Sequence, residues 1–189
     1  MTKQKLFQFG KIAFEIALCA LCVAVIAQNR ILLSRLRAQE NISGTRVGQK
    51  VGDLVGTALN GAMEQIVLPE SRQKLLIITF SPACQYCKAN QKGWAALARA
   101  LKQDAKWRVV WVSRDPLDPT REYCAASEIP SSDAVADPPY RTYAQLGLRV
   151  VPRMIAVLPG GKVDRVWEGQ LSTEVWKEVY SYFGVRWSL

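Results

Sequence analysis

Residues 75–87 read LLIITFSPACQYC. The apolar, β-prone run Leu75–Phe80 predicts a buried strand. Beyond the cysteines, apolar residues recur at the spacing of one helix face: Trp94, Leu97, Ala98 and Leu101. Cys84 and Cys87 therefore stand where a strand passes into a helix. The free N–H groups and positive dipole end of a helix start stabilise a thiolate, the form that attacks disulfides. We expect a redox site here.

The rest of the chain alternates strand and helix signals. Asn60-Gly61 predicts a hairpin turn between short apolar runs at 54–55 and 66–68. Further strands are expected at Trp107–Ser113, Pro152–Leu158 and Lys162–Glu168, and helices from Asp118 to about Glu128, from Asp137 to Gly147, and after Ser172. This order predicts an α/β fold with a central mixed sheet flanked by helices.

The N-terminal stretch has a different character. Apolar residues dominate from 7 to 33, roughly the 20 residues that cross a bilayer. An uncleaved anchor competes with a secretory signal cleaved after Val25-Ile26-Ala27, and the helical continuation Ile31–Leu36 favours the anchor. We expect a membrane anchor and juxtamembrane helix in residues 1–40 and one domain in residues 47–189.

Charge and composition exclude some classes of function. The formal net charge is +9, and its excess lies mainly in the first 50 residues, beside the expected membrane. The basic residues form no recognisable nucleic-acid reader, so we expect no nucleic-acid partner. The chain has no histidine, which removes the commonest general base and metal ligand.

These features together resemble the thioredoxin superfamily, and within it the membrane-anchored TlpA/ResA-like thiol–disulfide oxidoreductases. Three stretches carry the resemblance: Phe80–Lys88 with its C-x-x-C, Leu146–Pro152, and Gly160–Gly169. The insertion between Ser113 and Tyr140 is also typical of that branch.

The resemblance implies roles for the site residues. Cys84 would attack, and Cys87, one turn inward, would resolve the mixed disulfide. Gln85 and Tyr86 would tune the redox couple and contact the substrate. The implied fold is thioredoxin-like, with no cofactor and no metal.

A second implied feature lies opposite the cysteines. Pro152 would follow a cis peptide bond that places the Val151 backbone beside the sulfurs, where it pairs with an extended substrate strand. Lys88, Arg149 and Arg153 would add positive potential that favours a thiolate.

The sequence departs from the family pattern in places. Thr79 replaces the acid that thioredoxin buries before its Phe, and Ala83 stands where a Trp usually precedes the first cysteine. Tyr86 replaces the common proline of the motif. The shorter Phe-Ser-Pro-Ala-Cys form is similar to thioredoxin-like proteins of the methylamine-utilisation type.

The expected setting is the bacterial inner membrane, crossed once, with the domain on the periplasmic side. Substrates would be protein thiols and disulfides, apocytochromes among them, as in cytochrome c maturation. Because no flavin or nicotinamide motif is present, electrons would come from a membrane partner. The competing class is a non-catalytic accessory subunit of a membrane complex.

Other interpretations of the cysteines are weaker. A zinc site lacks further ligands, a structural disulfide is strained at a helix start, and a peroxidase fits only Ser81-x-x-Cys84. Cys19 and Cys22 form a second C-x-x-C, which we interpret as lipid-tolerant residues rather than a relay. Cys124 is expected to be a packed core thiol.

Overall fold

The computed structural model describes residues 18–32, 44–66, 73–137 and 140–186. The chain divides into two units, Met1–Ser43 and Gly44–Leu189. In the first unit, residues 18–32 form a helix whose apolar side chains are exposed. Among the described residues, no helix has both the length and the apolar character to span a membrane. Much of the expected anchor, at 7–17 and at 33, lies outside those residues.

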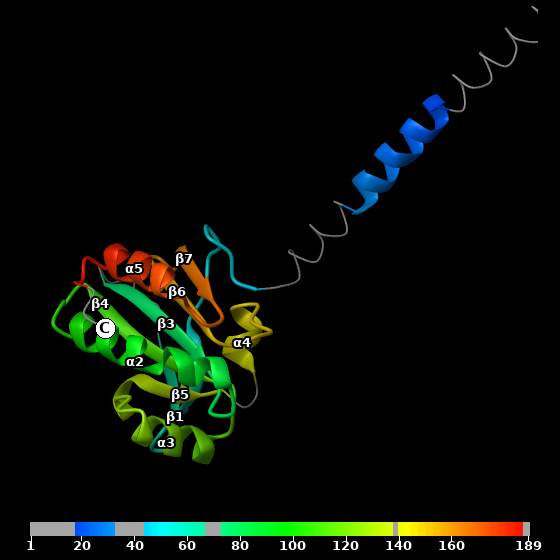
Figure 1. Ribbon diagram of the computed structural model, residues 1–189. Coiled ribbons are helices and arrows are strands. Elements are labelled where there is room, and N and C mark those ends of the chain that lie inside the picture. The colour runs from blue at the N-terminus through cyan, green and yellow to red at the C-terminus, as the bar shows by residue number, and fades with distance from the viewer. Residues whose placement is uncertain (1–17, 33–43, 67–72, 138–139, 187–189) are drawn as a thin grey trace, which may run out of the picture. The chain divides into compact units, whose positions relative to one another are not determined.

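The second unit is built on a seven-stranded mixed sheet of order β2-β1-β5-β4-β3-β6-β7 (Figure 1). Its strands are β1 Leu54–Ala58, β2 Met63–Ile66, β3 Lys74–Phe80, β4 Trp107–Ser113, β5 Ala134–Ala136, β6 Arg153–Val157 and β7 Val163–Glu168. β3, β4 and β5 run parallel, and the other pairs are antiparallel. The predicted α/β fold with a mixed sheet is confirmed.

Helices cover both faces of this sheet. They are α2 Gln85–Leu101, α3 Leu117–Ala126, α4 Arg141–Gln145 and α5 Thr173–Tyr182, with a 3₁₀ turn at Ser131–Asp133. Side chains of β3 alternate between two cores: Leu76, Ile78 and Phe80 pack with α2, α3 and α5, whereas Leu75 and Ile77 pack with α4. The strand predicted as buried is therefore buried on both faces.

Several predicted boundaries were wrong. α3 begins at Leu117, so Asp118 lies in its first turn and does not cap it. α4 begins at Arg141 rather than after Asp137, although the Asp137 carboxylate accepts hydrogen bonds from the N–H groups of Arg141 and Tyr143. β6 begins one residue after Pro152. Strand β5 was not predicted, because three residues carry too little pattern.

The β1–β2 hairpin and the start of α5 agree better with the sequence predictions. β1 and β2 are antiparallel around Asn60-Gly61, and Gly61 has the positive φ of 92° that favours glycine. The Ser172 hydroxyl accepts a hydrogen bond from the Val175 N–H at 3.4 Å, as expected of a helix cap.

Candidate redox site

Cys84 forms the N-cap of α2. Phe80 ends β3, and the Cys84 N–H donates to the Ser81 carbonyl at 3.0 Å, which closes the turn between strand and helix. Cys84 has the extended backbone of a cap, with φ −83° and ψ 115°. Its Sγ accepts the Cys87 N–H at 3.3 Å. The sulfur thus takes the place of a capping oxygen.

Cys87 lies in a different environment one turn later. Its side chain is fully buried in the core that includes Phe80, whereas Cys84 is half-buried. Burial, and after it the side-chain hydrogen bond with Cys84, raises the pKa of the Cys87 thiol well above its ordinary value. The structure therefore distinguishes an accessible sulfur at the helix start from a sheltered one behind it.

The loop before β6 brings Pro152 to the cysteines. The Val151–Pro152 peptide is cis, as expected. The Cys84 thiol donates to the Val151 carbonyl at 3.9 Å. This proximity follows from the sheet: β6 is the antiparallel neighbour of β3, with Thr79 opposite Arg153, so the start of β6 meets the end of β3.

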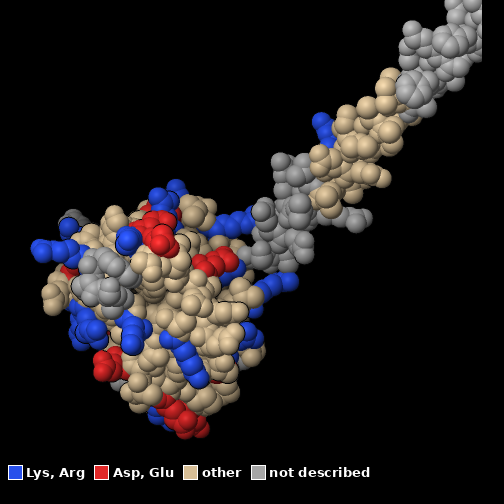
Figure 2. All heavy atoms as spheres, viewed as in Figure 1, with Lys and Arg blue, Asp and Glu red and all other residues tan. Residues whose placement is uncertain are grey.

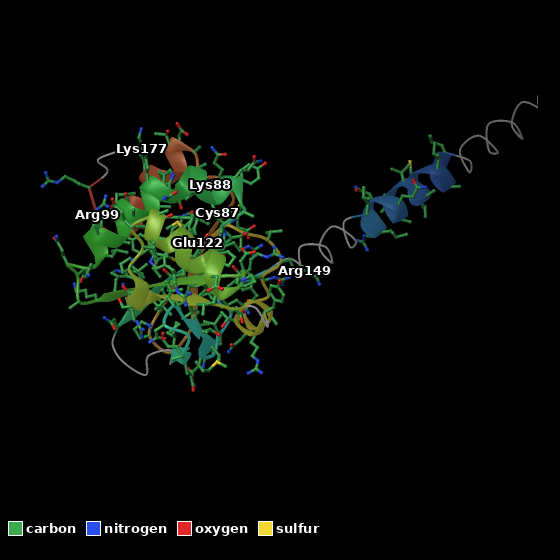
Figure 3. All side chains as sticks on the ribbon, turned by 90° about the horizontal axis from the view of Figure 1, so that it is seen from below. Cys87, Lys88, Arg99, Glu122, Arg149 and Lys177 are labelled. Atoms are coloured by element: carbon green, nitrogen blue, oxygen red, sulfur yellow. The ribbon has the colours of Figure 1, made fainter. Side chains whose placement is uncertain are left out.

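The other predicted site residues divide into two groups. Gln85, Tyr86 and Lys88 are exposed in the first turn of α2 with the cysteines, and Arg149 is exposed on the loop before Pro152; Figure 3 labels Lys88 and Arg149. Arg153 is not in this rim. Its side chain is 2% exposed and forms a 3.0 Å ion pair with Glu168. Its guanidinium also packs against Gly44, where a Cβ would collide with it.

Thr79 does not act as a substitute acid. Its hydroxyl is buried, accepts the Arg153 N–H at 3.2 Å and lies 3.4 Å from the Arg153 carbonyl. These contacts hold β6 against β3. The position at which thioredoxin carries a carboxyl group is therefore occupied by a sheet contact.

Sequence reasoning missed Asp115 and Tyr123. Asp115 follows β4, and its charge acts on the Cys87 thiol. Tyr123 of α3 stacks on Phe80 at 5.2 Å between ring centroids, and burial raises its pKa to about 12. One signal could have located Asp115. It follows the strand Trp107–Ser113, and the carboxyl ends of parallel strands meet at one edge of a sheet.

The remaining cysteines lie apart from this pair. All five cysteines are among the described residues and are free. Cys124 is a buried core thiol whose pKa is raised by burial to about 12. Cys19 and Cys22 are exposed on the helix of the first unit. Within the part of the chain that the structure describes, no three His, Cys, Asp or Glu side chains are grouped to hold a metal.

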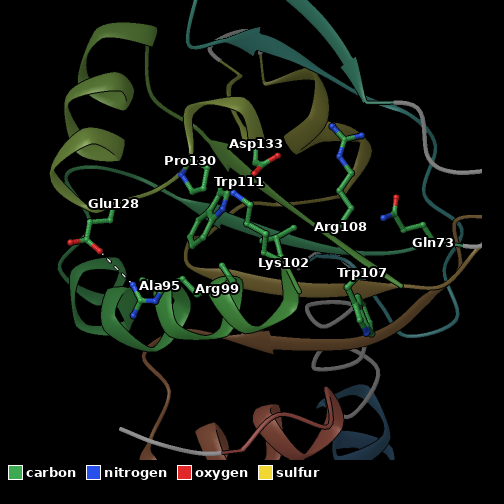
Figure 4. A pocket seen from close by; sticks show the side chains of 12 residues that line it. Gln73, Ala95, Arg99, Lys102, Trp107, Arg108, Trp111, Glu128, Pro130 and Asp133 are labelled. Carbon is green, nitrogen blue, oxygen red and sulfur yellow. Dashed lines mark hydrogen bonds and ion pairs between the residues drawn. The ribbon is translucent and has the colours of Figure 1, made fainter. Parts of the chain in front are cut away.

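Two hollows of the domain lie away from the cysteine pair. One cavity of about 300 Å³ lies between α2 and β4 and is lined by Trp107, Trp111 and three basic side chains (Figure 4). Another, of about 720 Å³, borders Cys124 and Arg121. Cys84 is half-buried and is followed by Tyr86, which is 49% exposed, while Val150, next to Val151, is 53% exposed.

The surface charge is mixed. On the face shown in Figure 2, Lys and Arg side chains are interspersed with Asp and Glu side chains, and broad areas carry neither. The described residues visible there form no continuous basic stripe of the kind that tracks a phosphate backbone.

Comparison with known proteins rests on structure. No family model matches the chain, and no curated protein matches it. Among solved structures, the thioredoxin domain of a thiol-disulfide oxidoreductase from Bacteroides vulgatus matches with TM-score 0.59 and 16% identity, covering 73% of this chain and 97% of that one. A thiol:disulfide interchange protein from Bacteroides sp. matches with TM-score 0.60 and 14% identity, covering 74% and 91%.

A third matching structure is a different kind of protein. Peroxidoxin BcpB from Mycobacterium tuberculosis matches with TM-score 0.61 and 14% identity, covering 76% of this chain and 99% of that one. Identities this low establish the fold alone. The chain therefore has the thioredoxin-like fold of these structures.

Proposed function

We propose that the domain exchanges disulfides with protein thiols through Cys84 and Cys87. One observation carries the proposal: an accessible sulfur caps a helix start beside the Val151 carbonyl, with a second thiol buried behind it. Position, hydrogen bonding and access together favour Cys84 as the attacking thiolate.

The reaction proceeds in two exchanges. Cys84 Sγ attacks a substrate disulfide, forms a mixed disulfide, and releases one substrate sulfur as a thiol. Cys87 Sγ then attacks Cys84 Sγ, loses its proton, and displaces the second substrate sulfur. The cysteine pair is oxidised to a disulfide and the substrate is reduced to two thiols. The same steps in reverse oxidise a substrate.

The surroundings of Cys84 suit a polypeptide substrate. The exposed Gln85 and Tyr86 lie on one side of the sulfur, and Val151 presents its carbonyl on the other. An extended substrate strand can pair with the Val151 backbone while its own sulfur approaches Cys84. A sulfur flanked by exposed side chains and by a backbone carbonyl suits a protein substrate.

The proposed setting is the bacterial inner membrane. The apolar residues 7–33 and the basic residues around them support a single-pass anchor, with the domain on the periplasmic side. There the domain would receive electrons from a membrane donor and pass them to extracytoplasmic proteins, apocytochromes among them. The helix 18–32 exposes Leu18, Leu21 and Val23, which suits lipid contact.

A reductase assay with a trap tests the function. Supplied with a dithiol, the parent protein should reduce a model protein disulfide, and Cys84→Ser should abolish this activity. Cys87→Ser should accumulate an unresolved mixed disulfide on Cys84, which mass spectrometry would identify. The buried Cys124→Ser serves as the matched control. Equal activity of the parent and Cys84→Ser would rule out the assignment.

The second candidate is a non-catalytic accessory subunit of a membrane complex, favoured by the contacts that commit Thr79 to the sheet. Such a subunit should co-purify stoichiometrically with its complex in detergent even when Cys84 and Cys87 are both replaced. Recovery only as a free protein would count against it.

A further inference from the structure

Asp115 is a half-buried acid that the disulfide exchange described above leaves without a role. Its Oδ2 atom is buried and has no hydrogen-bond partner. A buried carboxylate oxygen without a partner is costly, because its desolvation is not compensated. Such an atom calls for an explanation in terms of function.

The fold holds Asp115 at the same sheet edge as the cysteines. The parallel strands β3 and β4 end together, with Phe80 opposite Ser113. The Arg114 N–H donates to the Phe80 carbonyl at 3.1 Å, which links the chain segments that follow β3 and β4. The segment after β3 leads to Cys84, and the segment after β4 leads to Asp115.

Hydrogen bonds fix the backbone around Asp115. Its N–H donates to the Ser113 hydroxyl at 3.1 Å. The Thr120 hydroxyl, at the start of α3, contacts the Ser113 hydroxyl at 2.7 Å and the Asp115 carbonyl at 3.3 Å. The two contacts that Asp115 itself makes here use its backbone N–H and carbonyl, so its carboxylate remains available.

The resolving step requires a proton acceptor near Cys87. Besides Asp115, two phenols interact with the thiol pair, Tyr123 and Tyr143, and Arg114 acts on Tyr143. Burial raises the pKa of Tyr123 to about 12 and that of Tyr143 further, so both phenols hold their protons near neutrality. Arg114 is a cation, and Cys84 Sγ is bonded to the substrate in the intermediate. Neither group can therefore accept the proton of Cys87.

We propose that Asp115 accepts the proton of Cys87 Sγ as the Cys84–Cys87 disulfide closes. This proposal rests on the proposed function. Cys87 Sγ forms its bond to Cys84 Sγ, the bond from Cys84 Sγ to the substrate sulfur breaks, and the Cys87 proton moves to the carboxylate directly or through one water. The substrate sulfur leaves with the electron pair of the broken bond. Electrons and protons balance without a further reactant.

The electrostatics of the dithiol form agree with this role. Burial is the main cause of the raised Cys87 pKa, and the Asp115 charge adds to it. Burial, with a smaller addition from the carboxylate, therefore holds Cys87 as a neutral thiol until it attacks. Transfer of the proton to Asp115 then removes the negative charge that opposed thiolate formation.

A two-phase assay with the chromogenic disulfide DTNB tests the proposal. The full chain carries Cys19→Ala and Cys22→Ala to silence its exposed thiols. Attack by Cys84 releases one coloured thiolate, and closure by Cys87 releases the second. In Asp115→Asn the first phase should keep its rate, and the second should slow by about 10²-fold near pH 7, the usual size of an acid–base contribution. The deficit should shrink as pH rises, because hydroxide then deprotonates Cys87.

Matched variants make the outcomes decisive. Glu122→Gln removes an exposed carboxylate of α3 (Figure 3) and should leave both phases unchanged. Asp115→Glu should restore most of the second phase. If Asp115→Asn does not fold, Asp115→Ser provides the same comparison. A second phase equal to the parent's, or a deficit that does not change with pH, would overturn the role of Asp115. A first phase that survives Cys84→Ser would instead overturn the proposed function.

Discussion

Cys84 and Cys87 are separated by one helical turn, yet their environments are opposite. The first accepts a backbone N–H at the start of α2 and is half-buried, whereas the second is enclosed by the core beneath Phe80. Disulfide exchange needs this asymmetry, because one sulfur must meet the substrate and the other must wait until a mixed disulfide has formed. Their catalytic roles stay predictions until exchange is measured.

Cys124 provides a residue-scale prediction about alkaline stability. Its folded-state pKa is raised by burial from about 9 to about 12, so the folded state keeps a proton that the unfolded state loses. Stability contributed by the neutral thiol is complete below pH 9 and falls as pH rises toward 12, by about 1.4 kcal/mol per pH unit.

The measurement is urea unfolding under reducing conditions at pH 8 and pH 10.5. We expect the free energy of unfolding to fall less steeply with pH in Cys124→Ala than in the parent. Cys87 and Tyr123 contribute to the same decline, so part of it should remain. Identical slopes for parent and variant would show that Cys124 ionises freely in the folded state.

At the scale of elements, α2 is held in place by two residues that sequence patterns did not single out. The buried Asn90 side chain donates to the Gly169 carbonyl at 2.8 Å and accepts the Leu171 N–H at 3.0 Å, which ties α2 to the loop before α5. At Gly93, the carbonyl accepts the Tyr180 hydroxyl at 3.1 Å, and the Trp176 ring packs over the Cα. These contacts position the helix whose first turn carries both thiols.

Gly93→Ala is predicted to destabilise the domain. Alanine normally stabilises a helix interior by about 1 kcal/mol relative to glycine. Here an added Cβ would meet the Trp176 ring at 2.5 Å. Overpacking of this kind costs about 1–3 kcal/mol, so we expect a net loss, measured as a lower urea midpoint.

A second background separates the two effects of this substitution. In Trp176→Leu the ring is gone, so Gly93→Ala should be neutral or stabilising there. Lys92→Ala, at the exposed neighbouring position, should change the midpoint little in either background. A stabilising Gly93→Ala in the parent would mean that α5 yields at this contact.

At the scale of the whole molecule, the segment 44–51 joins the second unit to the first. Its Gly48 N–H donates to the Val163 carbonyl at 2.8 Å, and the Val51 N–H donates to the Gly161 carbonyl at 2.8 Å. The Thr45 hydroxyl donates to the Leu146 carbonyl at 2.5 Å, at the start of the loop that leads to Pro152. The segment therefore belongs to the fold of the domain and supports the loop that faces the cysteines.

Two truncations test this assignment. A chain starting at Gly44 should unfold at nearly the same urea concentration as the full chain in detergent. A chain starting at Gly52 should lose about 2 kcal/mol or more, because it also gives up the burial of Val51 and the backbone hydrogen bonds of the segment. Equal stability of the two truncated chains would show that the segment 44–51 does not contribute to the stability of the domain.

Local sequence patterns were sufficient to predict much of the secondary structure of this protein. Leu75–Phe80, the C-x-x-C at a helix start and the hairpin at Asn60-Gly61 are short-range signals, because periodicity and turn chemistry act between near neighbours. Together with the family resemblance, they led us to expect a thioredoxin-like fold and to predict Cys84, Cys87 and Pro152 as site residues. The short β5 and the start of α4 were misjudged, since β5 pairs with β1 and β4, and Thr142 of α4 forms hydrogen bonds with the backbone of Val55, both distant in the chain.

Tertiary structure alone decided which side chains surround the thiols. Arg153 looked like a source of positive potential, but the pairing of β6 with β7 places it beside Glu168. The sequence assigned no role to Asp115, but the parallel pairing of β3 and β4 places it at the sheet edge from which the chain continues to the cysteines. Burial and electrostatic coupling depend on distances in space, and a linear pattern contains none of them.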